Sequence, residues 1–119
     1  MARILMIEDS AFQRFALKKL LKPDHHEILE ADDGQKGLER ARQEKPEVIL
    51  TDILMPNMNG LEFLQALQEE GLGIPVIVVT ADIQETTRQK AREFGVRAII
   101  KKPPKGPELR EAIQDALPA

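Results

Sequence analysis

The sequence contains no cysteine, tryptophan or tyrosine, and its aromatic residues are four phenylalanines. Without cysteine the chain cannot form a disulfide bond or a thiolate metal site. So few aromatic side chains leave little surface on which nucleic-acid bases could stack. No apolar stretch is long enough to cross a bilayer, and the first residues do not have the pattern of a secretory signal. We therefore expect a cytoplasmic protein with no membrane contact.

An excess of positive charge is also missing. The net charge is −3 and the isoelectric point is about 5.4, whereas general nucleic-acid binders are usually basic. The 119 residues are 42% hydrophobic and 31% charged, which is ordinary for a soluble globular domain. We expect one domain, residues 1–119, with no direct contact to nucleic acid.

Hydrophobic periodicity predicts five strands that alternate with five helices. The strands are expected at 3–7, 27–31, 48–51, 74–80 and 96–100. The helices are expected at about 11–21, 34–45, 60–70, 83–94 and 107–117. Their inward-facing positions are expected to include Phe12 and Phe15 in the first helix, Leu61 in the third and Ile83 in the fourth.

This alternation predicts an α/β fold with a doubly wound parallel sheet, right-handed crossovers and helices on both faces. The first, third and fourth strands are the most apolar and belong in the centre of the sheet. The second and fifth strands then lie at the edges, which gives the strand order 2-1-3-4-5. In such a sheet ligands bind at the carboxyl edge, between the first and third strands.

Polar residues stand at or just after the ends of four of the predicted strands: Glu8 and Asp9, Asp52, Thr80, and Lys102. An isolated aspartate after one strand would usually only begin a turn. Here the ends of all four strands converge on one edge, and acids gathered there repel one another unless a cation lies among them. Carboxylate oxygens suit Mg²⁺, while a hydroxyl and an ammonium suit a phosphoryl group. The pattern indicates transfer of a phosphoryl group onto a carboxylate.

Four segments resemble the response-regulator receiver domains of two-component signalling, and the resemblance covers essentially the whole chain. These segments are Ile7-Glu8-Asp9-Ser10, the run from Asp52 to Gly60, Val79-Thr80-Ala81, and Lys102-Pro103. Each is a weak signal alone, but their order and spacing together are specific. The resemblance implies a flavodoxin-like fold and a cis Lys102–Pro103 peptide bond.

The resemblance also implies a role for each residue of the cluster. Asp52 would accept the phosphoryl group from a histidine kinase or a histidine phosphotransfer protein. The metal site for Mg²⁺ would consist of Glu8, Asp9, Asp52 and the backbone carbonyl of Leu54. Thr80 and Lys102 would bind the phosphoryl group. The expected protein is a signalling phosphoacceptor rather than an enzyme with turnover, and it would switch an output partner.

Two departures from the family pattern concern the output. Ile99 stands where the family usually has an aromatic residue on the fifth strand, so the usual aromatic switch is absent. Pro104 stands where an aromatic residue often follows the Lys-Pro pair. Basic residues, Arg88 and Arg92 among them, favour an output surface formed by the fourth helix, the fifth strand and the fifth helix, although simple solvation explains them equally well.

Two other functions fit parts of this pattern. A Mg²⁺-dependent phosphohydrolase usually needs a second acid two residues after the first, and Leu54 stands there instead. A degenerate receiver that binds partners without phosphorylation is opposed by the intact Asp52, Thr80 and Lys102. His25 and His26 lie at the opposite edge of the sheet, where we expect a solvated turn. The sequence is compatible with a stand-alone receiver or with part of a larger protein.

Overall fold

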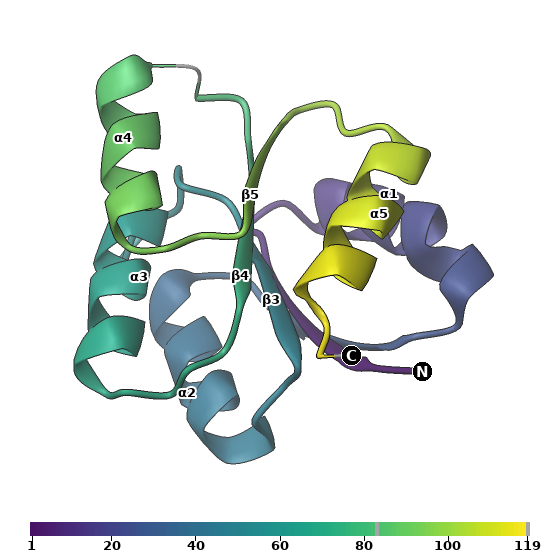
Figure 1. Cartoon of the computed structure of the whole chain (residues 1–119), viewed down its shortest axis with the longest axis horizontal. Helices are drawn as coiled ribbons and strands as arrows, with labels where there is room; N and C mark the ends of the chain where they lie inside the picture. Colours follow the sequence, from purple (N-terminus) through teal and green to yellow (C-terminus); the bar gives the residue numbers. More distant parts are fainter. Residues whose placement is uncertain (83, 119) are drawn as a thin grey trace.

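The computed structural model describes residues 1–82 and 84–118, and in these ranges five parallel strands form one sheet in the order β2-β1-β3-β4-β5 (Figure 1). The strands are β1 (Arg3–Ile7), β2 (Glu27–Ala31), β3 (Val48–Thr51), β4 (Val76–Thr80) and β5 (Ala98–Lys101). The helices are α1 (Ala11–Leu21), α2 (Gly34–Glu44), α3 (Gly60–Glu69), α4 (Glu85–Glu93) and α5 (Gly106–Ala116), with a short 3₁₀ turn, η1 (Lys22–Asp24), after α1. The predicted fold class and strand order are confirmed. None of these helices is long and apolar enough to span a membrane.

The three central strands are buried on both faces of the sheet. Every residue of β3 and β4 is buried, which explains why their sequences are continuous rather than alternating apolar runs. The register places Ile7 beside Thr51 and Thr80 beside Lys101. Because the strands are parallel and in step, the residues that follow them meet at one edge.

Neighbouring residues of each central strand face two separate cores. Leu5 and Ile7 pack with Phe63 under α2, α3 and α4, while Ile4 and Met6 pack with Ile113 under α1 and α5. Figure 1 shows these two helical layers on either side of the sheet. The two layers hold the sheet from both sides and leave its carboxyl edge accessible.

The prediction for the inward face of α1 was wrong. Phe12 is 79% exposed and Phe15 is 60% exposed, while the buried residues of the helix are Leu17 and Leu21. In this orientation Arg14, three residues before Leu17 and on the same face of the helix, points toward the sheet edge. There its guanidinium binds the Glu8 carbonyl and the Glu30 carboxylate.

Other differences are local. Strand β4 begins at Val76 rather than at residue 74, since Pro75 has no N–H to donate and only its carbonyl binds the sheet. Strand β5 begins at Ala98 rather than at residue 96, after Gly95 in a left-handed conformation. Leu61 is only half-buried. The expectation for Ile83 lies outside the described residues.

The predicted solvated turn at the opposite edge is half right. His25 is exposed. The side chain of His26, by contrast, is only 3% exposed. Its Nδ1 accepts a hydrogen bond of 3.0 Å from the backbone N–H of Ala2, which ties the turn to the first strand.

Candidate functional site

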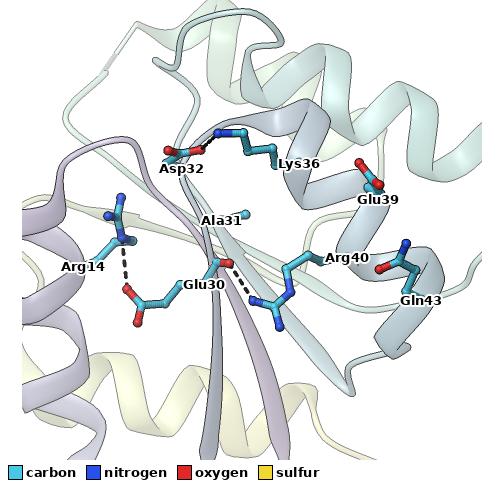
Figure 2. Close-up of a pocket in the computed structure, with 8 residues that line it drawn as sticks. All are labelled: Arg14, Glu30, Ala31, Asp32, Lys36, Glu39, Arg40 and Gln43. Atoms are coloured by element: carbon cyan, nitrogen blue, oxygen red, sulfur yellow. Dashed lines mark hydrogen bonds and ion pairs between the residues drawn. The ribbon is translucent and has the colours of Figure 1, made fainter.

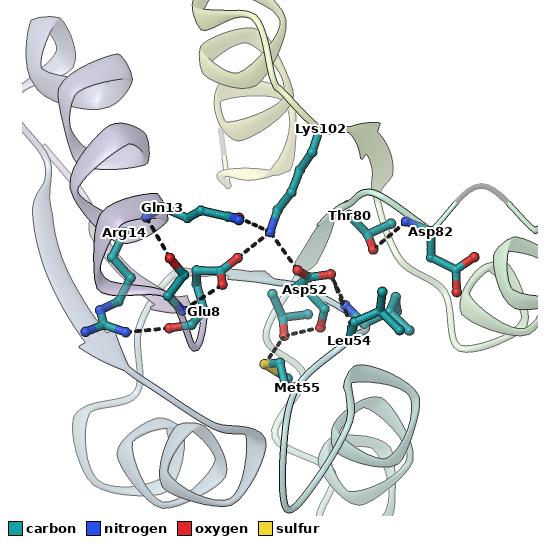
Figure 3. Close-up of polar contacts among 12 residues, drawn as sticks. Glu8, Gln13, Arg14, Asp52, Leu54, Met55, Thr80, Asp82 and Lys102 are labelled. Atoms are coloured by element: carbon teal, nitrogen blue, oxygen red, sulfur yellow. Dashed lines mark hydrogen bonds and ion pairs between the residues drawn. The ribbon is translucent and has the colours of Figure 1, made fainter.

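The predicted residues lie at the carboxyl edge of the sheet, in the order set by the strands. Glu8 follows β1, Asp52 follows β3, Thr80 ends β4 and Lys102 follows β5. In Figure 3, Asp52 lies at the centre, with Glu8 on one side and Thr80 on the other. The four side chains therefore occupy one site although nearly the whole chain separates the first from the last.

Asp52 is 7% exposed and its two carboxylate oxygens have different partners. Oδ1 accepts hydrogen bonds from the backbone N–H groups of Ile53, at 2.6 Å, and Leu54, at 3.2 Å. Oδ2 forms an ion pair of 2.6 Å with Lys102 Nζ. The backbone fixes the orientation of the carboxylate, so that one oxygen faces the ammonium group.

Lys102 lies between two buried acids. Its ammonium contacts the carboxylates of Glu8 and Asp52 and also the side-chain oxygen of Gln13 (Figure 3). Burial alone would lower the pKa of Lys102, but the hydrogen bonds to Asp52 and Glu8 outweigh it, so the pKa lies above its ordinary value. Lys102 is thus firmly cationic at neutral pH. The Lys102–Pro103 peptide bond is cis, as the resemblance implied.

Glu8 is 2% exposed, and its second carboxylate oxygen accepts a hydrogen bond of 3.0 Å from the Ser10 N–H. Burial raises the pKa of Glu8, an effect that the hydrogen bond from Lys102 offsets only in part. Asp9, by contrast, is exposed. Within residues 1–82 and 84–118 no three acidic or histidine side chains are arranged as a metal cluster. The structure therefore brings Glu8 and Asp52 onto one cation, and Asp9 lies outside that contact.

Thr80 is buried, and its hydroxyl accepts a hydrogen bond of 3.1 Å from the backbone N–H of Asp82. Its carbonyl accepts a hydrogen bond of 2.9 Å from the backbone N–H of Lys102, which places the two residues on adjacent chain segments. The small side chain of Ala81 follows and is exposed. In Figure 3 Thr80 lies next to Asp52, and its hydroxyl is engaged within its own loop.

Comparison with known proteins identifies the family. The family model for the response regulator receiver domain matches residues 4–114. The chain belongs to this family. Protein PilH of Pseudomonas aeruginosa is 41% identical over 105 residues, which are 87% of both chains. Chemotaxis protein CheY of Halobacterium salinarum is 31% identical over 117 residues, which are 98% of both chains.

A solved structure shows the same architecture. The chemotaxis protein CheY4 of Vibrio cholerae superposes with a TM-score of 0.89 at 27% identity, over 98% of this chain and 99% of that one. Receiver domains are phosphoacceptor switches that histidine kinases phosphorylate and that regulate output proteins. They generally bind Mg²⁺ at an acidic pocket. This receiver domain is a signalling protein of that kind.

Two residues of α1 that were not predicted as site residues also contact the receiver site. Gln13 contacts the Lys102 ammonium, and Arg14 Nη1 donates to the Glu8 carbonyl at 2.6 Å. A signal was available, since the first turn of α1 directly follows Glu8 and Asp9 and must pass over the carboxyl edge. The assumed burial of Phe12 and Phe15 placed the wrong face of the helix there.

A polar cleft of about 570 Å³ lies beside the receiver site, between α1, β2 and α2 (Figure 2). Arg14 Nε pairs with Glu30 at 3.0 Å, and Arg40 donates to the Glu30 carbonyl at 3.0 Å. Lys36 pairs with Asp32 at 3.0 Å. Each of these cations already contacts an acid or a carbonyl. We therefore interpret the residues of this cleft as a network of ion pairs and hydrogen bonds that covers the edge strand β2.

Proposed function

We propose that Asp52 is the phosphoacceptor of this receiver domain. The observation that carries the proposal is the Lys102 ammonium, which lies in direct contact with the buried carboxylates of Asp52 and Glu8. In the transfer, an Asp52 oxygen attacks phosphorus, the new O–P bond forms, and the N–P bond to the donor histidine breaks. Lys102 offsets the charge of the incoming phosphoryl oxygens, and Thr80 donates its hydroxyl hydrogen to one of them.

The donor set fits Mg²⁺. Glu8 and Asp52 are buried carboxylates, Asp9 adds an exposed one, and the backbone carbonyl of Leu54 lies two residues after the acceptor. These are hard oxygen donors, the kind that magnesium sites combine with phosphate oxygens. We assign these four groups to the metal, which would supply charge neutralisation for the phosphoryl oxygens.

The acceptor assignment is tested with Mg²⁺ and acetyl phosphate, followed by intact mass. The wild type should gain the mass of one phosphoryl group, and Asp52→Asn should gain none. Asp32→Asn is the matched control, because it removes the same charge from an exposed carboxylate near the site. Equal labelling of Asp52→Asn and the wild type would refute the assignment.

For the phosphodonor we propose docking on an apolar groove of about 530 Å³ beside the site. Phe12, Leu20 and Pro104 line this groove, and so does Lys102 of the receiver site. A helix that carries a phosphohistidine can rest on these side chains while its phosphoryl group reaches Lys102 and Asp52. The groove therefore adjoins the residues that would take part in phosphoryl transfer. The exposed Phe12 is the expected anchor.

This docking proposal has a matched pair of variants on one helix. Phe12→Ala should slow transfer from a phosphorylated histidine phosphotransfer protein while leaving labelling by acetyl phosphate unchanged. Phe15→Ala removes an equally aromatic, exposed side chain that lies outside the groove, and should leave both rates unchanged. Equal slowing by the two variants would contradict the proposed anchor.

The output surface that we propose lies on α4, β5 and α5. Arg97 and Lys105 border a hollow of about 680 Å³ opposite Glu108 and Glu111 of α5. Positively and negatively charged side chains are therefore exposed next to one another on this face. Such a pattern can select a partner whose charges are complementary. Arg97→Glu should weaken binding of the output protein without changing phosphorylation at Asp52. Unchanged binding would remove this face from the proposal.

A further inference from the structure

The loop from residue 53 to residue 59 carries the Leu54 carbonyl, and two side-chain contacts anchor it. At the first, the N–H groups of Ile53 and Leu54 bind the Asp52 carboxylate. At the second, Asn57 Nδ2 donates a hydrogen bond of 3.0 Å to Asp33 Oδ2. Leu54 lies between the two anchors. With a contact on either side of it, the direction of this carbonyl is constrained by both.

The second anchor depends on a side chain that is itself fixed. Asp33 is 6% exposed and is the N-cap of α2, where its Oδ1 accepts the N–H of Lys36 at 2.8 Å. Each carboxylate oxygen thus has its own donor, one from the helix and one from the loop. Asn57 reaches Asp33 with a φ of 66°, a left-handed conformation that asparagine tolerates better than most residues.

The loop also lies against the backbone of α2. A Cβ atom placed on Gly34 would be 2.5 Å from the carbonyl oxygen of Met58, closer than side-chain atoms are found. The glycine therefore lets the loop approach the first turn of α2 directly. The contact between Asp33 and Asn57 fixes where along that turn the loop rests.

We propose that Asp33 and Asn57 form a clamp that positions the Leu54 carbonyl, and with it the Asp52 carboxylate, for Mg²⁺. The inference rests on the proposed metal-binding role of these groups. Neither clamp residue touches the phosphoryl group, so both are positioning residues. Removal of such outer contacts from metal sites typically weakens metal affinity by about 10–100-fold.

The test is a titration of each variant with Mg²⁺ alone, in which backbone amide chemical shifts report binding of the metal. Asn57→Ala changes no charge and should weaken Mg²⁺ binding by about 10-fold. The exchanged pair, Asp33→Asn combined with Asn57→Asp, restores one donor and one acceptor across the contact and keeps the net charge. It should recover affinity to within about 3-fold of the wild type, whereas a purely local loss of packing would not be recovered.

Asn59→Ala is the control, because it removes a helix cap at the far end of the same loop without touching Asp33. It should bind Mg²⁺ as the wild type does. Three results would each overturn the clamp: wild-type affinity in Asn57→Ala, no recovery in the exchanged pair, or equal weakening in Asn59→Ala. If the wild type itself shows no Mg²⁺-dependent shifts while its fold is intact, the proposed metal site fails instead.

Discussion

Helices α3 and α4 follow the two strands that carry Asp52 and Thr80, and they cover the same face of the sheet (Figure 1). They are attached very differently. Helix α3 begins with a capping box between Asn59 and Glu62 and buries Phe63, Leu64 and Leu67. Helix α4 begins without a side-chain hydrogen bond from its N-cap residue, and among its nine residues, all described, only Ala91 is buried.

The difference indicates which half of the site is fixed before phosphorylation. On the α3 side, the loop after Asp52 is held by the hydrogen bonds of Ile53, Leu54 and Asn57, and the helix that follows it is capped and well buried. On the α4 side, the nine residues of the helix bury only Ala91, so little of their own apolar surface opposes a shift. The phosphoryl group can shift the equilibrium between two conformations only by the difference in its interaction free energy with each of them. We therefore expect the acceptor half to stay in place and the Thr80 half to move.

The largest expected effect concerns the α3 side. Phe63 is fully buried, so Phe63→Ala should lower the free energy of unfolding by about 3–5 kcal/mol. In α4, Ala91→Gly should lower it by only about 1 kcal/mol, mainly through helix propensity. Urea unfolding of both variants measures the two values. Similar losses would show that α4 is held as firmly as α3.

Thr80 supplies the second prediction, because its hydroxyl, which accepts a hydrogen bond from the Asp82 N–H, would donate to the phosphoryl group in only one of the two states. Amide chemical shifts on addition of Mg²⁺ and beryllofluoride should change through α4 and change little through α3. Thr80→Ala should remove most of the response in α4 while Asp52 still binds the beryllofluoride.

Ile99 provides the contrasting variant. It is half-buried against the core under α2, α3 and α4, and it has neither the ring nor the polar tip of the usual aromatic switch. Ile99→Ala should therefore leave most of the α4 response intact. If Ile99→Ala abolished the response and Thr80→Ala preserved it, the switch would run through β5 instead.

The third prediction uses the caps themselves. Asn59→Ala removes the side-chain cap of α3 and should cost about 1 kcal/mol of stability. Gln84→Asp introduces a side chain that can cap α4, and should stabilise the protein by up to about 1 kcal/mol. It should also slow hydrogen exchange in the first turn of α4. No change in that exchange would mean that the start of the helix is already held by other contacts.

The sequence was sufficient to predict the sheet and the position of the site. The apolar runs of β1, β3 and β4 specify a central position because only strands covered on both faces need them. Once the strands are parallel, Asp52 and Lys102 must reach the same edge. These predictions depend on periodicity and on strand direction, which local sequence carries.

The rotation of α1 could not be predicted in the same way. The helix has two apolar stripes, one with Phe12 and Phe15 and one with Leu17 and Leu21, and either could face the sheet. The orientation adopted brings Arg14 to Glu8, just after β1, and to Glu30 of β2, and these partners become neighbours only after folding. The contact between Asp33 and Asn57 joins two loops, and the two residues are 24 positions apart in the sequence. It could not be predicted because loop sequences lack the hydrophobic periodicity that identifies helices and strands.

The smallest expected effect is the pH dependence of that loop contact. The hydrogen bond from the Lys36 N–H, followed by the one from Asn57, holds the pKa of Asp33 below its ordinary value of 3.8. A carboxyl whose folded-state pKa is lowered adds stability that is fully present above the ordinary pKa and is lost as the pH falls through the folded-state value. The stability difference between the wild type and Asp33→Asn should therefore be constant near neutral pH and shift toward the variant below pH 3.8. Urea unfolding from pH 7 to about pH 3 measures it, with Asp32→Asn as the exposed control. A difference that stays constant over this range would show that the Asp33 charge does not hold the acceptor side together.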